Sequence, residues 1–208
     1  EKSFWNQLQE RLDMVKQNEL PYQYQEPELQ WQKLKKTIDV ADMVTPVTGI
    51  KQADLDKILN HLMQYPEHFN VNSKIKRLQK SKQELLNKNQ VDWALGELSA
   101  YASIMLDGSN VRMSGQDVKR GTFSHRHAVF FDEQTDAQYN RLNTLEGATG
   151  QYFIYNSLLS EFAVLGFEYG YSLASPDHLA IWEAQFGDFY NGAQTIVDQF
   201  ISAGESKW

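Results

Sequence analysis

One glutamate in this sequence has neighbours that would change its chemistry. Glu161 falls within an apolar segment, 156–174, that has the spacing of a helix and starts at a plausible cap, Asn156. Burial among its neighbours would raise the pKa of this carboxyl group and favour a hydrogen bond to a neutral heteroatom. An ion pair with a helix end or a buried arginine is the alternative. The neighbours in question are Leu158, Leu159, Phe162 and Leu165.

An aromatic run at residues 182–192 offers a second kind of chemistry. It leaves a predicted strand and contains Gln185, Phe186 and Phe189. Aromatic rings stack on flat heteroaromatic ligands, and a Gln amide hydrogen-bonds a ring edge. The run therefore indicates a ligand surface, with ordinary core packing as the alternative.

A basic loop lies in the more acidic half of the chain. Residues 91–208 hold 6 Lys and Arg against 15 Asp and Glu, a balance of -9, whereas residues 1–90 hold 14 against 12, a balance of +2. Within the loop 114–127, His125, Arg126 and His127 are candidates for binding an anionic substrate. Salt bridges to the surplus carboxylates are the alternative. Two alternate histidines without an acidic or Cys partner at ligand spacing do not predict a metal site.

Periodicity suggests how these residues are positioned. Residues 1–88 are rich in polar residues with spaced apolar anchors and predict a helical arm, whereas residues 89–208 alternate helices with short apolar runs. That alternation predicts an α/β fold with a mainly parallel sheet and helices on both faces, and its sites lie beyond the carboxyl ends of the strands. Expected helices cover 1–20, 53–64, 72–88, 93–105, 156–174 and 191–203, and expected strands cover 110–113, 127–131, 151–155 and 179–186.

Several classes of protein are disfavoured. The chain has no Cys, which removes disulfides and thiolate chemistry. It lacks a phosphate-binding glycine motif and a basic stripe, so neither nucleotide phosphates nor nucleic acid is expected as a partner. The most apolar stretch, 154–174, contains two glutamates, so no membrane span is predicted, and no targeting segment is visible.

Three segments together resemble a known family. The segments read Ser-Gly-Gln-Asp-x-x-Arg-Gly-Thr-Phe at 114–123, Ser-Leu-Leu-Ser-Glu-Phe-Ala-x-Leu-Gly-Phe-Glu-Tyr-Gly at 157–170 and Trp-Glu-Ala-Gln-Phe-Gly-Asp-Phe-x-Asn-Gly-Ala-Gln at 182–194. They closely resemble the thiamine-diphosphate-dependent 2-oxoglutarate dehydrogenases, which are related to transketolases, and the similarity runs from about residue 91 to residue 208.

The resemblance implies a role for individual residues. The matched region corresponds to a three-layer pyrimidine-binding domain, here its N-terminal, truncated part. Glu161 would hydrogen-bond the aminopyrimidine ring nitrogen of thiamine diphosphate and serve as the catalytic residue. Leu159 would support the bent cofactor, and Gln116 stands where related enzymes often carry Glu. The residues expected to line the pyrimidine are Gln185, Phe186 and Phe189.

The same resemblance implies a reaction and partners. The enzyme would decarboxylate 2-oxoglutarate and pass a succinyl unit to a lipoyl group on a partner succinyltransferase, in the cytoplasm or, in a eukaryote, the mitochondrial matrix. The family binds diphosphate and Mg²⁺ through a Gly-Asp-Gly…Asn motif on another domain, and the sequence contains no such motif. A second subunit of a homodimer would complete the site, so we expect the isolated chain to be inactive.

Three alternatives stay open at this stage. The dicarboxylate could be 2-oxoadipate, since the basic loop suits either acid. A non-catalytic oligomerisation module would use the helix at 156–174 as its interface. A hydrolase would need Glu161 and either Glu183 or Asp188 to face one cleft.

Overall fold

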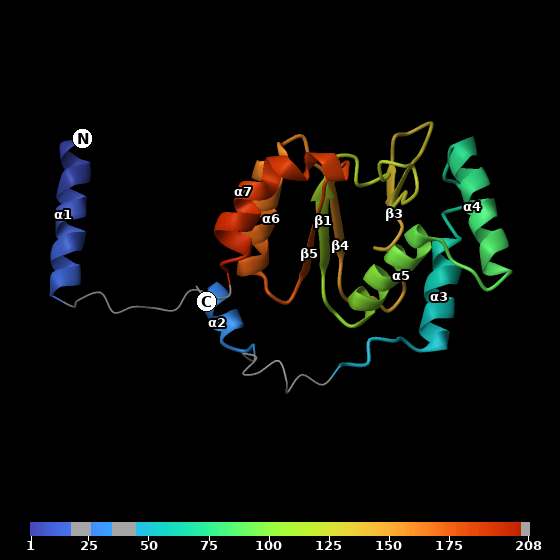
Figure 1. Ribbon diagram of the computed structural model, residues 1–208, viewed down its shortest axis with the longest axis horizontal. Coiled ribbons are helices and arrows are strands. Elements are labelled where there is room, and N and C mark those ends of the chain that lie inside the picture. Colours follow the sequence, from blue (N-terminus) through green and yellow to red (C-terminus); the bar gives the residue numbers. More distant parts are fainter. Residues whose placement is uncertain (18–25, 35–44, 205–208) are drawn as a thin grey trace. The chain divides into compact units, whose positions relative to one another are not determined.

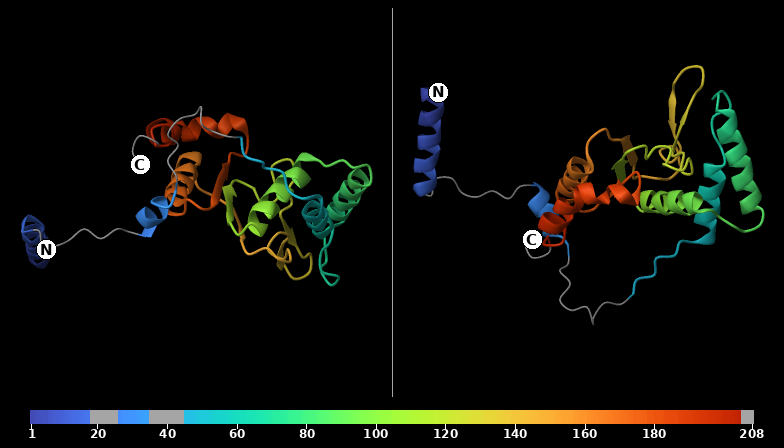
Figure 2. Two further views of the ribbon diagram at one scale, coloured as in Figure 1. Left: turned by 90° about the horizontal axis from the view of Figure 1, so that it is seen from below. Right: turned by 45° about the horizontal axis from the view of Figure 1, so that its top comes forward.

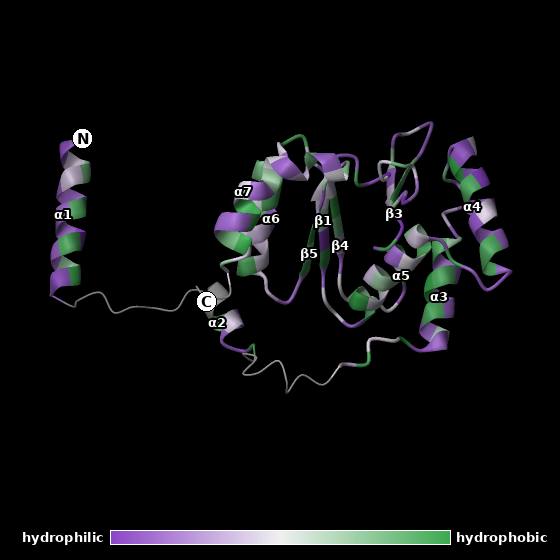
Figure 3. Cartoon of the chain, in the orientation of Figure 1, coloured by the Kyte–Doolittle hydropathy of each residue, from purple (hydrophilic) through white to green (hydrophobic). Residues whose placement is uncertain are grey.

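The computed structural model describes residues 1–17, 26–34 and 45–204. Packing divides the chain into two units, Glu1–Asp42 and Met43–Trp208. The first unit contains helix α1 (Lys2–Lys16) and helix α2 (Glu26–Trp31). Hydrophobic and hydrophilic residues alternate around α1 (Figure 3), and none of its residues is buried within its unit. The predicted first helix is confirmed, although its expected end near residue 20 lies outside the described residues.

A three-stranded parallel sheet organises the second unit (Figure 1). Its strand order is β4-β1-β5, formed by β4 (Tyr152–Asn156), β1 (Val111–Gly115) and β5 (Leu179–Glu183). Met113 of β1 pairs in register with Ile154 of β4 and Ile181 of β5. Because all three strands run the same way, their carboxyl ends meet at one edge. The predicted parallel sheet is confirmed.

Helix α5 (Trp93–Leu106) covers one face of this sheet. Asp92 caps it by accepting a hydrogen bond from the backbone N–H of Leu95 at 2.8 Å. Its apolar face packs with the odd-numbered residues of β1 into a continuous core. Residues of this core with at most 1% exposure include Leu95, Leu98, Ala102, Met105, Val111 and Met113.

Helices α3 (Gln52–Leu62) and α4 (Ser73–Leu86) belong to the same compact unit. Ile58 and Leu62 of α3 are fully buried in the core that α5 forms. The domain boundary expected after residue 88 stays a prediction. Lys74, Lys76, Arg77 and Lys80 of α4 are exposed, whereas Lys82 on the same helix is not. It is instead 1% exposed, and its ammonium donates to the carbonyl of His125 at 3.1 Å.

Helix α6 (Glu161–Ala174) covers the opposite face, which gives the unit three layers (Figure 1). Its start corrects the sequence prediction: Asn156 does not cap this helix, because it ends strand β4. Ser160 is the N-cap, and its hydroxyl accepts from the backbone N–H of Ala163 at 3.5 Å. Glu161 is therefore the first residue of the helix rather than one turn inside it.

A separate antiparallel hairpin corrects another expectation. The apolar run at 127–131 was predicted to supply a strand of the parallel sheet. Strand β2 (Val129–Phe131) pairs instead with β3 (Gln138–Asn140) in a two-stranded sheet that stands away from the main one (Figure 2). Val71, which precedes α4, forms an isolated bridge with Asp132 of this hairpin.

The segment after β5 is less regular than predicted. The strand ends at Glu183, and a 3₁₀ helix, Gly187–Ala193, follows before the short helix α7 (Gln194–Ile196). A π-helical turn, Val197–Ile201, replaces the last part of the single helix expected over 191–203. Within the described ranges, no helix is both long enough and apolar enough to cross a membrane.

Candidate functional site

A shallow depression, too narrow to admit a water molecule and here called the groove, lies at the carboxyl edge of the sheet, where β1 and β5 end and α6 begins. It brings together four residues that the sequence singled out: Gln116, Leu159, Glu161 and Gln185. The other residues lining it are Gly115, Val164, Trp182, Glu183 and Ala184. Sites of parallel α/β sheets occur at this edge. The roles of these residues toward a cofactor stay a prediction.

Gly115 allows strands β1 and β5 to approach each other closely at this edge. A Cβ atom at this position would lie 2.2 Å from the carbonyl oxygen of Glu183 and 2.8 Å from the side chain of Val118. Since the nearest obstacle is backbone, a side chain at Gly115 would push β1 and β5 apart. The glycine thus sets the width of the groove.

Glu161 is held in place from two sides. The amide Nε2 of Gln116 donates to its Oε1 at 3.3 Å. On the other side, a Cβ atom at Gly192 would lie 3.3 Å from its Oε2, so the carboxylate packs directly on that glycine. Its position at the N-terminus of α6 also places it where a helix attracts negative charge.

The apolar neighbours of Glu161 do not bury it as expected. Leu158 is fully exposed, Leu159 is 56% exposed, and Phe162 is 48% exposed. Glu161 itself is half-buried. Desolvation of this carboxylate therefore requires a ligand or a second surface to cover the apolar rim.

Aromatic rings extend from the groove on the side of Gln185. Phe186 and Phe189 lie edge to face with their ring centroids 5.9 Å apart, and both are more than two-fifths exposed. Phe123, from the basic loop, contacts Phe186 in the same way at 5.8 Å. The three rings thus form an exposed aromatic cluster, and its role as a ligand surface stays a prediction. Phe123 is a member that sequence reasoning did not assign.

The basic loop does not present Arg126 to a substrate. Its side chain is completely buried and forms ion pairs with Glu97 of α5 and Glu183 of β5. Burial alone would lower the pKa of Arg126, but hydrogen bonds to the two carboxylates raise it above its ordinary value. The expected role of Arg126 in substrate binding is therefore corrected, and the alternative of salt bridges holds for this residue.

The two histidines of the loop are also engaged. His127 Nε2 lies 2.8 Å from the hydroxyl of Ser124, and burial, followed by the nearby charge of Lys82, lowers its pKa. The ring of His125 packs over Gly121, whose φ of +81° and lack of a side chain leave room for it. The Nδ1 atom of His125 is buried without a hydrogen-bond partner. Substrate contact by either histidine stays a prediction.

A pair of catalytic carboxylates is not supported by the geometry. Glu183 lines the groove with Glu161, but both of its oxygens accept hydrogen bonds from Arg126. Asp188 lies in the exposed 3₁₀ helix. Among the residues described, no three His, Cys, Asp or Glu side chains form a group that could hold a metal ion.

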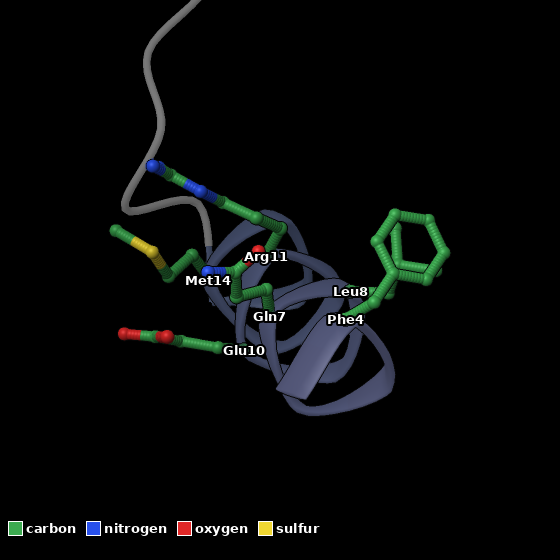
Figure 4. Close-up of a pocket in the computed structure, with 6 residues that line it drawn as sticks. All are labelled: Phe4, Gln7, Leu8, Glu10, Arg11 and Met14. Atoms are coloured by element: carbon green, nitrogen blue, oxygen red, sulfur yellow. The ribbon is translucent and has the colours of Figure 1, made fainter. Parts of the chain in front are cut away.

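A second depression runs along α1 and is lined by residues of that helix alone (Figure 4). Phe4 and Leu8 point to one side of the helix, whereas Glu10, Arg11 and Met14 point to another. One helix cannot enclose a ligand, so this depression does not compete with the groove as a site.

Sequence reasoning did not identify the two partners of Arg126. Glu97 stands 29 residues before Arg126, and Glu183 stands 57 residues after it, so no local pattern connects the three. The surplus of carboxylates in residues 91–208 was the available signal for these ion pairs. Gly192 was quoted in a motif but not assigned a contact.

Comparison with known proteins identifies a family model and several relatives that match most of the chain. The family model described as "Transketolase, pyrimidine binding domain" matches residues 89–208. A "2-oxoglutarate dehydrogenase, mitochondrial" of Caenorhabditis elegans is 54% identical over 164 residues, which cover 78% of this chain and 16% of that protein. The Saccharomyces cerevisiae protein of the same name is 44% identical over 207 residues, 98% of this chain and 20% of that protein.

A relative with another substrate in its name is similar to the same degree. A "Probable 2-oxoadipate dehydrogenase complex component E1 homolog" of Dictyostelium discoideum is 49% identical over 179 residues, which cover 86% of this chain and 20% of that protein. The chain spans about a fifth or less of the length of these curated relatives. The resemblance inferred from the motifs is confirmed, and the chain belongs to the family of transketolase pyrimidine-binding domains.

Proposed function

We propose that this chain forms the wall of a thiamine diphosphate site that contacts the aminopyrimidine ring, in an enzyme that oxidatively decarboxylates 2-oxoglutarate. The observation that carries the proposal is the meeting of Glu161, Gln116 and Gln185 at one groove. The substrate is suggested by the relatives named 2-oxoglutarate dehydrogenase, at 54% and 44% identity.

The side chains at the groove fit an aminopyrimidine. A carboxyl group such as Glu161 exchanges hydrogen bonds with a ring nitrogen, and the amides of Gln116 and Gln185 carry both donors and acceptors. Leu159 offers an exposed apolar contact, and the rings of Phe186 and Phe189 offer flat surfaces. The rim therefore suits a planar, polar-edged heteroaromatic ligand.

The groove does not fit a diphosphate. Its charged lining residues are Glu161 and Glu183, and the adjacent cation, Arg126, already donates to two carboxylates. Negative phosphates require cations or free backbone N–H groups. We therefore assign the diphosphate and its Mg²⁺ to residues outside this chain.

Glu161 would handle a proton at the pyrimidine. Bound thiamine diphosphate supplies the carbanion chemistry by which a 2-oxoacid loses carbon dioxide. The part of Glu161 is to exchange a proton with the ring nitrogen, while Gln116 fixes the direction of the carboxylate. Gly192 leaves the second carboxylate oxygen uncovered by a side chain.

The exposed apolar rim indicates where a partner belongs. Leu158, Leu159 and Phe162 lie beside the site and are half to fully exposed. We propose that a second subunit covers them, completes the site and desolvates Glu161. The isolated chain would then be inactive. The succinyl unit would pass to a lipoyl-bearing succinyltransferase, in the mitochondrial matrix of a eukaryote or the cytoplasm of a bacterium.

The test uses the complete enzyme and its reaction with 2-oxoglutarate. We expect Glu161→Ala to lower kcat about a hundredfold or more, because a positioned proton-transfer group contributes on this scale. Glu84→Ala is the matched control, since Glu84 is an exposed glutamate on α4. Near-normal turnover of a folded Glu161→Ala enzyme would overturn the proposal and favour a purely structural module.

A second substrate, 2-oxoadipate, is suggested by the Dictyostelium discoideum relative at 49% identity. The groove would contact the cofactor ring rather than the substrate, so its residues do not distinguish 2-oxoacids of different chain length. Comparing kcat/KM for 2-oxoglutarate and 2-oxoadipate decides between them. A clear preference for the longer acid would replace 2-oxoglutarate in the proposal.

A further inference from the structure

Arg126 uses every hydrogen-bond donor that it has. Nε and one N–H of Nη2 donate to Glu97, and the other N–H of Nη2 donates to Glu183. Nη1 donates to Glu183 Oε1 at 3.0 Å and to the carbonyl of Val118 at 2.8 Å. An arginine has five N–H donors in a rigid fork, so this side chain is saturated. We call the Glu97, Arg126 and Glu183 side chains the carboxylate clamp.

The carboxylate clamp joins three separate parts of the fold. Glu97 lies on α5, Glu183 ends β5, and Arg126 with Val118 belongs to the loop that follows β1. The loop and α5 also meet in the apolar core, where Val118 packs with Leu95 and Leu98. The clamp adds directed contacts that link the loop, the helix and the strand end.

One member of the carboxylate clamp also lines the groove. Glu183 is a lining residue, and its backbone carbonyl faces Gly115 across the sheet. The next two residues of the chain, Ala184 and Gln185, are lining residues as well. A movement of Glu183 would consequently shift the amide of Gln185 relative to Glu161.

We propose that Arg126 is a positioning residue, which holds Glu183 and thereby sets the direction in which Gln185 faces the aminopyrimidine site. This inference rests on the proposed function and deepens it, because it assigns a role to a residue that touches neither cofactor nor substrate. Arg126 is ruled out as a direct ligand by its complete burial.

Loss of the guanidinium would leave an electrostatic signature. Glu97 and Glu183 both lie within hydrogen-bond distance of one nitrogen, so without Arg126 they become neighbouring negative charges. Like charges at this separation favour uptake of one proton by the pair. The other titratable groups that interact with the clamp are Lys82, Tyr101 and Tyr152. Burial raises the pKa of both tyrosines, so neither titrates near neutrality.

The test measures thiamine diphosphate affinity of the complete enzyme by calorimetry with Mg²⁺. We expect Arg126→Met to weaken the binding of thiamine diphosphate about tenfold at about pH 8. Residues that orient a binding group from outside the site act on this scale. At about pH 6, part of the lost affinity should return. Arg126→Lys should fall between, since Lys has three donors. The double variant Arg126→Met/Glu183→Gln removes one of the two charges and should lose the pH dependence.

Arg112→Met is the matched control. Arg112 also forms a largely buried ion pair, with Glu168, but that partner does not line the groove. Its loss should lower stability without changing the affinity for thiamine diphosphate or its pH profile. The same comparison by hydrogen exchange should show faster exchange of residues 182–187 only in Arg126→Met.

The outcomes separate this inference from the proposed function. If the unmodified enzyme binds thiamine diphosphate and Arg126→Met binds it equally well at both pH values, the positioning role is wrong. Equal losses in Arg126→Met and Arg112→Met, without pH dependence, would also overturn it, because they indicate a general effect on stability. If the unmodified enzyme does not bind the cofactor, the proposed function fails, and the exchange of residues 182–187 alone decides whether Arg126 holds the strand end.

Discussion

The two faces of strand β1 differ in almost every physical respect. Val111 and Met113 point toward α5 into an apolar core, and both are at most 1% exposed. Arg112 and Ser114 point the other way and bind the buried carboxylate of Glu168 on α6, at 2.9 Å and 2.7 Å. Three aromatic rings surround the Arg112 guanidinium at about 5 Å.

This difference indicates how the fold separates stability from function. The α5 face of β1 is held by apolar burial. The α6 face is held by directed polar contacts, and its edge carries the groove with Glu161. Directed contacts cost desolvation, but they fix side-chain geometry. We therefore expect substitutions on the α5 face to act on stability and those at the α6 edge to act on ligand binding.

The largest effect on stability should come from the α5 face. Leu98 is completely buried, so Leu98→Ala should lower the free energy of unfolding by about 2–5 kcal/mol through lost burial and a cavity. Leu159→Ala, at a residue of the groove that is 56% exposed, should change it by no more than about 0.5 kcal/mol. Urea unfolding of both variants measures the contrast, and equal losses would remove the distinction between the two regions.

A smaller loss of stability should follow from substitutions on the α6 face of β1. Glu168→Gln keeps the size of the side chain but removes the charge that faces Arg112 and Ser114, and should cost about 2 kcal/mol. Replacing both partners, in Arg112→Met/Glu168→Leu, should cost less than that single change, because no buried charge is left unpaired. A double variant less stable than Glu168→Gln would show that the ion pair itself contributes net stability.

The smallest effect on stability should come from Asp132, next to the hairpin, and should appear only at low pH. Hydrogen bonds from the backbone N–H of Asn70, and then of Gln134 and Thr135, outweigh burial and lower the pKa of Asp132 from 3.8 to about 2. The folded state thus favours the charged form, so this contribution to stability is present above about pH 3.8 and is lost as the pH falls toward 2. Between about pH 3.8 and pH 2, the free energy of unfolding should therefore fall less steeply in Asp132→Asn than in the unmodified chain. The same pH dependence in both would contradict the lowered pKa of Asp132.

Much of the fold follows from local patterns, and the exceptions have physical causes. The helix α5 and the strands of the parallel sheet were predicted because their apolar residues repeat with the period of the element. The start of α6 was misplaced because Leu158 and Leu159 continue the apolar pattern, and Asn156 and Ser160 are both favourable N-cap residues. The run at 127–131 gave a strand, but three residues cannot specify which partner they pair with.

Some residues of the site were predicted from the sequence, and others were not. Gln116, Leu159, Glu161 and Gln185 were all selected from the sequence and meet at the groove. Arg126 was misread because its partners, Glu97 and Glu183, come from distant segments. The exposure of Leu158 and Phe162 was also unexpected, since periodicity shows that a residue is apolar but not whether this chain covers it.

Glu161 is proposed as the hydrogen-bond partner of an aminopyrimidine ring. A crystal structure of the complete enzyme with thiamine diphosphate and Mg²⁺ measures this directly. We expect a carboxylate oxygen of Glu161 at about 2.6–3.2 Å from the pyrimidine ring nitrogen, with Gln185 at the ring edge. A cofactor ring bound elsewhere, with Glu161 still bonded only to Gln116, would contradict it.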